Sequence, residues 1–280
     1  MKVFSVDLYE YFKIEKNGRE GVLKCYVMDN YSEIGIDRKH PAMLVVAGGG
    51  YTFRSNREAE PVALAYLPYG FNAFVLDYSV DPFGYPTQLI EGAMAIAYIK
   101  ENADKLNVDK DHVGAIGFSA GGHLCAMLAT LYDRKEVIDA LGDRAKNARP
   151  DAVVLSYPVI TSGPKAHVGS IKVLSQGDEA IKKLMSIENQ VTENSVPAYI
   201  WCTATDGCVP PQNSMLMASA YLKCGVPFEL HIFDKGAHGL SLANQMTHSC
   251  GRTDLADTHI GVWFNQSIEW LTRRGFVLIG

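Results

Sequence analysis

Short apolar runs alternate with helical patterns from about residue 42 to the end of this chain, and this alternation is the feature that most constrains the fold. The runs have the length and composition of buried strands and lie at 42–46, 73–76, 113–116, 152–155, 198–202 and 228–233. Helical patterns occupy 86–105 and 120–131, and the last helix is expected within 258–274. Such alternation is typical of βαβ units, so we predict an α/β fold with a mostly parallel central sheet and helices on both faces.

Two segments depart from the alternation. The first 30 or so residues predict two strands around the turn Lys16–Arg19, in which Asn-Gly is a hairpin signal. Residues 160–195 contain a short helical stretch near 179–185 and are the candidate for a small lid or flap over the carboxyl edge of the sheet. They are too few for a second domain, and no repeat or linker divides the chain. We therefore expect residues 1–280 to form a single domain with a minimal lid.

A serine stands between a predicted strand and a predicted helix. The sequence Gly117-Phe118-Ser119-Ala120-Gly121 follows the apolar run 113–116 and precedes a helix of small residues. A G-x-S-x-G turn in this context exposes the serine hydroxyl, because glycines on either side avoid collisions in a tight, strained turn. The N-terminus of the following helix also faces any developing negative charge. Ser119 is therefore the candidate nucleophile, and a glycine-rich turn without chemistry is the alternative.

The candidate acid is Asp206, which comes just after the apolar run 198–202. A carboxylate at such a strand end can hold an imidazole in the required tautomer and stabilise its protonated form. Asp234 and Asp178 are rivals, but Asp234 is close to the candidate histidine and Asp178 lies in the irregular segment. The alternative for Asp206 itself is a turn-capping role, since an aspartate before glycine is common in turns.

The candidate base is His238, in a glycine-containing loop just after the run 228–233. From such a loop an imidazole can reach over the sheet edge, take the proton of Ser119 and return it to the leaving group. His231 lies inside a predicted strand and His123 inside the predicted helix after the serine, so neither has this reach. The order Ser, Asp, His along the chain is the order that a G-x-S-x-G serine requires. A solvated loop histidine is the alternative.

A glycine-rich turn follows the first apolar run, at Gly48-Gly49-Gly50-Tyr51. Backbone N–H groups of such a turn can stabilise an oxyanion. We therefore expect an oxyanion hole made by Gly49, Gly50 and Ala120, the residue that follows the serine. A phosphate-binding loop is the rival, but the chain has neither a G-x-G-x-x-G that opens a helix nor a Gly-Lys-Ser/Thr motif.

Three further residues are candidates for substrate contacts. Tyr51 follows the oxyanion glycines and Tyr85 follows the second apolar run, so their rings are placed to narrow a pocket and to offer a flat face to a sugar. Packing in the core or lid is the alternative for both tyrosines. His167 is a third candidate, with an exposed loop position as its alternative.

Composition limits the partners. The net charge is −5 and no dense Lys/Arg cluster occurs, so nucleic acid is not an expected partner. No long uncharged apolar stretch predicts a membrane span, and neither a signal-type segment nor paired cysteine spacing points to export, so we expect a cytoplasmic protein. No metal-ligand motif is present, and we expect no metal or cofactor. The expected partner is a small-molecule ester; a homo-oligomer is left open.

Together these motifs resemble the acetyl esterase/lipase group of α/β-hydrolases, most of all its acetyl-xylan-esterase-related branch. The resemblance covers roughly residues 40–275 and rests on 46–51, Tyr85-Pro86, 117–124, 156–160, His167 with Gly169-Ser170, Asp206 with Val209-Pro210 and Asn213-Ser214, and 236–239. It implies an α/β-hydrolase fold and a serine carboxylesterase that removes short acyl groups, chiefly acetyl, from a sugar or small alcohol through an acyl-enzyme. Related lipases usually have a histidine ahead of the glycines, where this chain has Ala47.

Two other functions are compatible with such a scaffold. A peptidase would normally carry an extra gating domain, and this chain is too short for one. A catalytically silent binding protein would normally have lost the serine, the acid or the histidine, and candidates for all three are present. A fluorophosphonate probe, which labels only activated serines, separates the silent protein from the enzymes.

Overall fold

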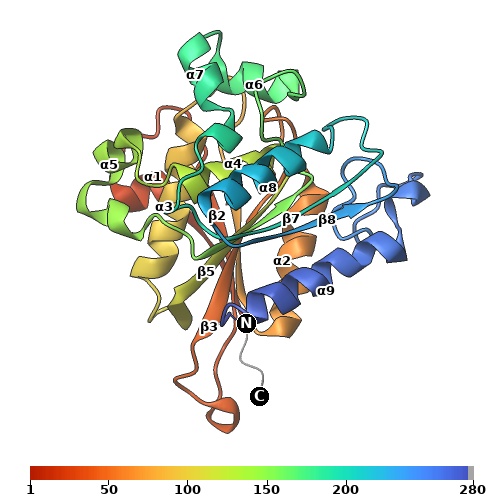
Figure 1. Cartoon of the computed structure of the whole chain (residues 1–280). Helices are drawn as coiled ribbons and strands as arrows, with labels where there is room; N and C mark the ends of the chain where they lie inside the picture. Colours follow the sequence, from red (N-terminus) through yellow and green to blue (C-terminus); the bar gives the residue numbers. More distant parts are fainter. Residues whose placement is uncertain (277–280) are drawn as a thin grey trace.

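An eight-stranded sheet with the order β1-β2-β4-β3-β5-β6-β7-β8 organises the part of the chain that the structure describes (Figure 1). The structure is a computed structural model that describes residues 1–276; the last residues of the predicted single domain, 277–280, lie outside the described residues. The strands are β1 (Lys2–Asp7), β2 (Val22–Val27), β3 (His40–Val46), β4 (Asn72–Asp77), β5 (Val108–Phe118), β6 (Ala152–Ser156), β7 (Ala198–Thr203) and β8 (Phe228–Phe233). β1 and β2 pair antiparallel to their neighbours, and the pairs from β4 to β8 are parallel. The predicted mostly parallel sheet is confirmed.

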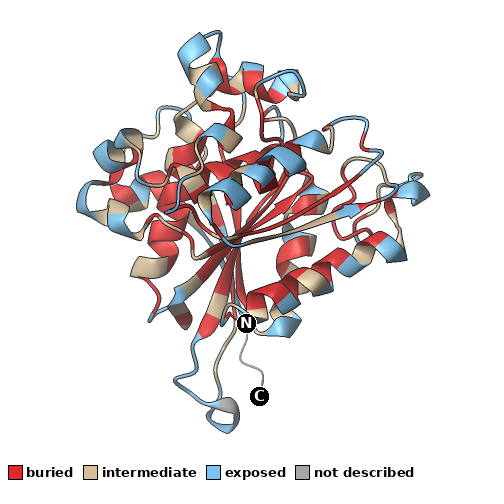
Figure 2. Cartoon of the chain, in the orientation of Figure 1, coloured by how far each residue is buried: buried red, intermediate tan, exposed pale blue. Residues whose placement is uncertain are grey.

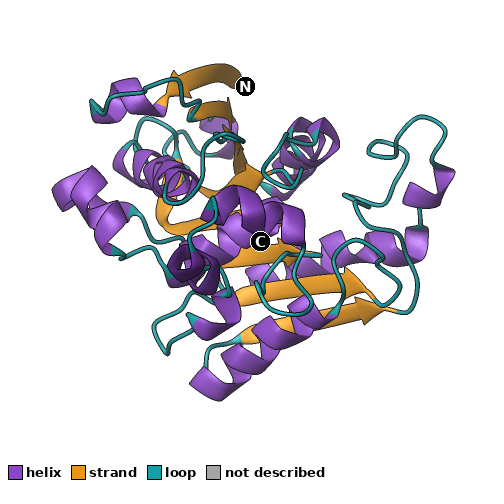
Figure 3. Ribbon diagram, turned by 90° about the horizontal axis from the view of Figure 1, so that it is seen from above, coloured by secondary structure: helices purple, strands orange, loops and turns teal. Residues whose placement is uncertain are grey.

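Helices cover both faces of this sheet, as predicted (Figures 2 and 3). In the described residues they are α1 (Leu8–Phe12), α2 (Glu60–Tyr66), α3 (Thr87–Glu101), α4 (Ala120–Thr130), α5 (Lys135–Leu141), α6 (Val168–Ser175), α7 (Glu179–Leu184), α8 (Gln212–Cys224) and α9 (Thr258–Thr272). Buried residues of α3, α4 and α8 share one hydrophobic core with the sheet, and those of α2 and α9 share a second. The two cores fix the sheet between two helical layers.

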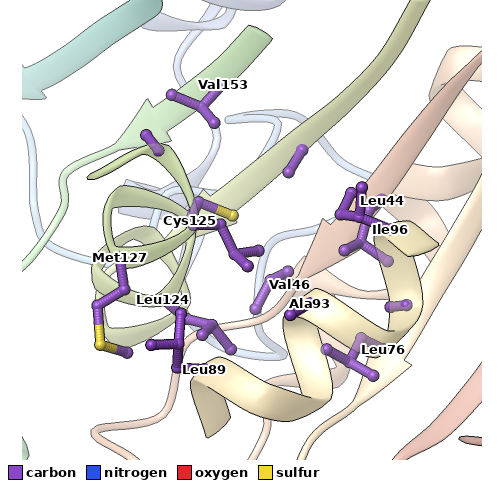
Figure 4. Packing of buried hydrophobic residues seen from close by; sticks show 14 of the residues in the cluster. Leu44, Val46, Leu76, Leu89, Ala93, Ile96, Leu124, Cys125, Met127 and Val153 are labelled. Carbon is purple, nitrogen blue, oxygen red and sulfur yellow. The ribbon is translucent and has the colours of Figure 1, made fainter. Parts of the chain in front are cut away.

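The side chains that pack α3 against the sheet are those that its periodicity predicts. Leu89, Ala93, Ile96 and Ala97 are fully buried. Figure 4 shows the first three facing strand residues and the side chains of α4. Burying a leucine or isoleucine side chain stabilises the fold by about 1.5–3 kcal/mol, so these contacts help to hold the helix on the sheet. α4, the helix that follows Ser119, packs against α3 in this layer.

The N-terminal segment differs from the predicted hairpin in its connection. β1 and β2 pair antiparallel in register from Lys2–Val27 to Asp7–Val22, as expected for two strands around a turn. Between them, however, the chain first forms α1. Asp7 caps this helix by accepting the N–H groups of Tyr9 and Glu10, and α1 buries Leu8, Tyr9 and Phe12. The predicted turn also forms, since the Arg19 N–H donates to the Lys16 carbonyl at 2.9 Å and Asn17 and Gly18 have φ values of 46° and 78°. The connection therefore contains α1, held by its cap and three apolar anchors, followed by the Asn-Gly turn.

The segment 160–195 contains two short helices that lie together at the top of Figure 1. α7 matches the predicted helical stretch, and Asp178 caps it by accepting the N–H groups of Ala180 and Ile181. α6 was not predicted. His167 caps it by accepting the N–H of Ser170, which brings this histidine into a defined position at the edge of the segment.

Candidate active site

Ser119 lies in a strained turn between β5 and α4. Its φ of 52° and ψ of −116° are unusual for a residue with a side chain. A β-carbon on Gly117 would lie 2.1 Å from the carbonyl oxygen of Gly121, and one on Gly121 would lie 2.2 Å from that of Val46. Both contacts are impossibly short for real atoms. The two glycines of the G-x-S-x-G pattern are therefore required by the approach of the backbones, as the pattern predicts.

Ser119, His238 and Asp206 form a chain of hydrogen bonds at the ends of β5, β8 and β7. His238 Nε2 lies 2.8 Å from Ser119 Oγ, and His238 Nδ1 lies 2.6 Å from Asp206 Oδ2. A carboxylate oxygen can only accept, so Nδ1 carries the ring proton and Nε2 is free to accept from the serine hydroxyl. This is the arrangement in which an imidazole can act as general base toward the serine.

The Asp206 side chain is 1% exposed, and both of its carboxylate oxygens accept hydrogen bonds. Its other oxygen, Oδ1, accepts the N–H groups of Cys208 at 2.8 Å and Val209 at 2.9 Å. The rival acids lie elsewhere: Asp234 is exposed, and Asp178 caps α7. Asp206 is thus the carboxylate that contacts His238.

The glycine turn after β3 presents main-chain donors beside the serine. A β-carbon on Gly48 would lie 3.0 Å from Ser119 Cβ, so the turn is in contact with the serine. Gly49 and Gly50 have φ values of 132° and 64°, which only glycine adopts readily. Within residues 1–276, no hydrogen bond from the N–H of Gly49, Gly50 or Ala120 is formed. These are the three N–H groups that the sequence predicts to bind an oxyanion.

His167 lies beside this turn. Its Cε1 is 3.7 Å from the position of a β-carbon on Gly50. Its Nδ1 accepts the N–H of Ser170 at 3.3 Å and lies 2.8 Å from that residue's Oγ, so a neutral ring carries its proton on Nε2. Burial, and then the nearby His238, lower the pKa of His167, which keeps this ring neutral. His167 therefore offers a neutral N–H donor next to the candidate oxyanion turn.

Tyr51 packs in the core, and Tyr85 packs partly against the same core. Tyr51 is fully buried, and its hydroxyl hydrogen-bonds His123 Nδ1 at 3.0 Å, so its ring cannot narrow a pocket. Tyr85 is half-buried and lies near Glu136 at the start of α5; burial, and then that carboxylate, raise its pKa to about 12. Within residues 1–276, neither phenol hydrogen-bonds Ser119, His238 or Asp206.

Sequence reasoning missed Glu58, Tyr157 and Arg57, which link the loops around the serine. Glu58 is 3% exposed and hydrogen-bonds both the glycine turn and Tyr157. Its only sequence signal is a charged pair ahead of an apolar helix, which normally indicates a solvated turn. Tyr157 stood in one of the motifs of the family resemblance, but nothing in the pattern indicated its partner.

Neither a metal centre nor a membrane span is found in the described residues. No group of three or more His, Cys, Asp or Glu side chains within 1–276 is arranged to hold a metal ion. No helix in the same range is long and apolar enough to cross a bilayer. The cytoplasmic location stays a prediction.

Comparison with known proteins identifies a family and several curated relatives. The sequence model of the BD-FAE family matches residues 28–221. An endo-1,4-beta-xylanase B of Butyrivibrio fibrisolvens is 39% identical over 215 residues, which cover 74% of this chain and 34% of that protein. The chain therefore spans about a third of the length of this curated relative.

Two solved structures resemble the fold over nearly the whole chain. An acetyl ester-xyloside bifunctional hydrolase of Caldicellulosiruptor lactoaceticus is 36% identical, with a TM-score of 0.80 over 92% of this chain and 89% of that one. The carboxylesterase Cest-2923 of Lactobacillus plantarum is 28% identical, with a TM-score of 0.87 over 100% of both chains. The α/β-hydrolase fold that the motifs implied is thereby confirmed.

Proposed function

The chain belongs to the BD-FAE family of α/β-hydrolases, and from this premise we propose that it is a serine carboxylesterase acting on short-chain, chiefly acetyl, esters. The observation that carries the proposal is the hydrogen-bonded chain from Ser119 through His238 to Asp206, beside N–H groups without an acceptor among the described residues. A nucleophile, a base and oxyanion donors around one point are the parts that acyl transfer requires.

In the first half-reaction, Ser119 Oγ attacks the ester carbonyl carbon while His238 Nε2 takes the hydroxyl proton. Asp206 holds the Nδ1–H of the ring and stabilises the imidazolium that forms. The N–H groups of Gly49, Gly50 and Ala120 donate to the tetrahedral oxyanion, and removing one such donor typically costs about 100- to 1,000-fold in rate. His238 then gives its proton to the leaving alcohol, and the acyl group stays on Ser119.

In the second half-reaction, water replaces the alcohol. His238 Nε2 takes a proton from the water as its oxygen attacks the acyl carbon, and returns it to Ser119 Oγ as the acyl–serine bond breaks. The acid is released and the starting proton distribution is restored. The protein groups that move protons in both half-reactions are those of the hydrogen-bonded chain.

We assign the alcohol side of the substrate to a sugar or small alcohol. Support comes from the relative whose name includes an acetyl ester-xyloside activity, and from His167, whose neutral Nε2–H suits an uncharged oxygen acceptor. Phe53 is 61% exposed, and its ring lies 3.2 Å from the position of a β-carbon on Gly49. An exposed aromatic face beside a polar donor suits a sugar ring.

The test is Ser119→Ala against the parent protein, with p-nitrophenyl esters of increasing chain length and acetylated xylo-oligosaccharides. The alanine variant is expected to fold normally, to escape fluorophosphonate labelling and to lose hydrolysis by several orders of magnitude. In the parent, kcat/KM is expected to decline in steps beyond about four carbons, because one methylene is worth about 1–3 kcal/mol in a fitting pocket. An active alanine variant contradicts the nucleophile, and a maximum at eight carbons or longer contradicts the short acyl group.

A further inference from the structure

Glu58 is a buried carboxylate whose two oxygens bind different parts of the site. It ends the short 3-10 turn Asn56–Glu58, between the glycine turn and α2. Oε2 accepts the N–H of Gly48 at 2.9 Å, and Oε1 accepts the hydroxyl proton of Tyr157 at 2.7 Å. Gly48 directly precedes Gly49, so Glu58 holds the main chain from which the proposed oxyanion donors extend.

Tyr157 carries this connection to the loop of His238. Its hydroxyl oxygen accepts the N–H of Ser241 at 2.8 Å, and its ring lies edge-on to the His238 ring, with centroids 5.0 Å apart. Burial, and then the Glu58 carboxylate, raise the pKa of Tyr157 well above its ordinary value, so the phenol keeps its proton as a donor. One hydroxyl therefore joins the carboxylate to the histidine loop.

The same turn holds the histidine loop a second time through Arg57. Its Nη2 donates to the carbonyl of Gly239 at 2.9 Å, and its Nη1 donates to that of Thr247 at 2.8 Å. Ser241 Oγ donates in return to the Arg57 carbonyl at 2.8 Å. The turn Asn56–Glu58 is thus bonded to both loops, which are far apart in the sequence.

We propose that Glu58 and Tyr157 are positioning residues that fix the oxyanion turn relative to the His238 imidazole. The inference rests on the proposed esterase function. Transition-state stabilisation requires donors and base to be held to within a fraction of an ångström, and a misplacement of about 1 Å can cost about 100-fold in rate. Loops seldom hold such geometry unless buried contacts fix them.

The carboxylate is necessary because it supplies two acceptor oxygens. In Glu58→Gln the amide keeps the shape but supplies only one acceptor, so either the Gly48 N–H or the Tyr157 O–H loses its partner. We expect kcat for p-nitrophenyl acetate to fall about 10- to 100-fold, with KM changed by less than about 3-fold, because the defect appears in the transition state. The rate of fluorophosphonate labelling at Ser119 should fall in parallel.

Glu91 in α3 provides a matched control. It is fully buried and accepts a backbone N–H, that of Ser79 at 2.6 Å, together with a tyrosine hydroxyl, that of Tyr9 at 2.9 Å. These partners are not on the glycine turn or the histidine loop. Glu91→Gln should therefore lower the melting temperature and leave kcat per folded molecule unchanged.

The experiment compares melting temperature, kcat, KM and labelling rate in the parent, Glu58→Gln and Glu91→Gln. If Glu58→Gln loses melting temperature as Glu91→Gln does and keeps its kcat, the residue is merely structural and the proposal is wrong. Should Glu58→Gln fail to fold, Tyr157→Phe removes one hydroxyl and must show the same selective loss of kcat.

The outcomes also separate the two proposals. A parent protein that neither hydrolyses esters nor reacts with the probe contradicts the esterase function itself. An active, labelled parent with an unimpaired Glu58→Gln contradicts only the positioning role. In the combined Glu58→Gln/Tyr157→Phe variant, the loss of kcat should be no greater than about that of the more damaging single change, because both break one connection.

Discussion

The two ring nitrogens of His167 have separate environments. Nδ1 is engaged by Ser170 at the start of α6, while Nε2 has no hydrogen-bond partner among the described residues. A change that removes only the second nitrogen therefore separates a structural role from a substrate contact. Asparagine is such a replacement, since it is a favoured N-cap and has a shorter side chain.

We expect His167→Asn to raise KM for an acetylated xyloside about 3- to 10-fold, the worth of one hydrogen bond. Its melting temperature and its kcat for p-nitrophenyl acetate should stay near the parent values. Steady-state kinetics on both substrates, with thermal unfolding as the control, measure this. An unchanged KM for the xyloside would remove His167 from the substrate site.

At the scale of elements, the strands from β3 to β8 could be predicted, whereas among the helices α7 was predicted and α1, α2, α5, α6 and α8 were not. β3, β4, β6 and β7 consist mostly of apolar residues, and the buried second half of β5 is the run that the sequence showed. β8 alternates apolar and polar residues, as suits an edge strand, and it has the predicted bounds. α3, α4 and α9 followed from periodicity and flanking residues. α1, α5 and α6 are only one or two turns long, too short to be stable by themselves. Side-chain caps hold α1 and α6, and buried residues hold α5 against the rest of the fold.

The junction of β5 and α4 is the element-scale feature most sensitive to substitution. Because a β-carbon on Gly121 would meet the Val46 carbonyl oxygen at 2.2 Å, Gly121→Ala must displace backbone. We expect it to lower the free energy of unfolding by about 3 kcal/mol or more, measured by urea denaturation. At Gly207 a β-carbon would meet nothing within 4 Å, so Gly207→Ala should change stability by no more than about 0.5 kcal/mol. Equal effects at the two positions would contradict the steric argument.

At the scale of the whole molecule, the sequence located the residues at strand ends and missed the groups that join them. Ser119, Asp206 and His238 each follow an apolar run, and parallel strands bring their carboxyl ends to one edge. Glu58 and Tyr157 meet across 99 positions of sequence through a side-chain contact. No local pattern encodes such a contact, because it depends on how both loops fold back over the sheet.

His123 of α4 is another buried side chain that connects segments far apart in the sequence. It hydrogen-bonds Tyr51 beside the oxyanion turn and, through Nε2, the carbonyl of Met185 after α7. Burial lowers its pKa from 6.5 to about 4, so the ring is neutral in the folded protein. The unfolded chain binds a proton near pH 6.5. The stability that this neutral ring contributes is therefore complete above about pH 6.5 and is lost as the pH falls toward 4.

We expect the parent protein to lose about 2–3 kcal/mol more unfolding free energy than His123→Gln between pH 7 and pH 4.5. Glutamine keeps hydrogen-bonding capacity but does not titrate, and the other acid-sensitive groups are common to both proteins. Urea denaturation at the two pH values gives the difference. Identical losses would show that His123 is not the group responsible.

The proposed oxyanion donors belong to the main chain, and this affects how a mutational scan of the protein would look. No substitution deletes the N–H of Gly49, Gly50 or Ala120, except proline. In a complete set of single variants, we therefore expect activity to fall at the positive-φ glycines, which shape the turn, and at Glu58, which anchors it. A screen that truncates side chains would identify the residues that position the turn. It would not identify the oxyanion donors, because these are main-chain N–H groups.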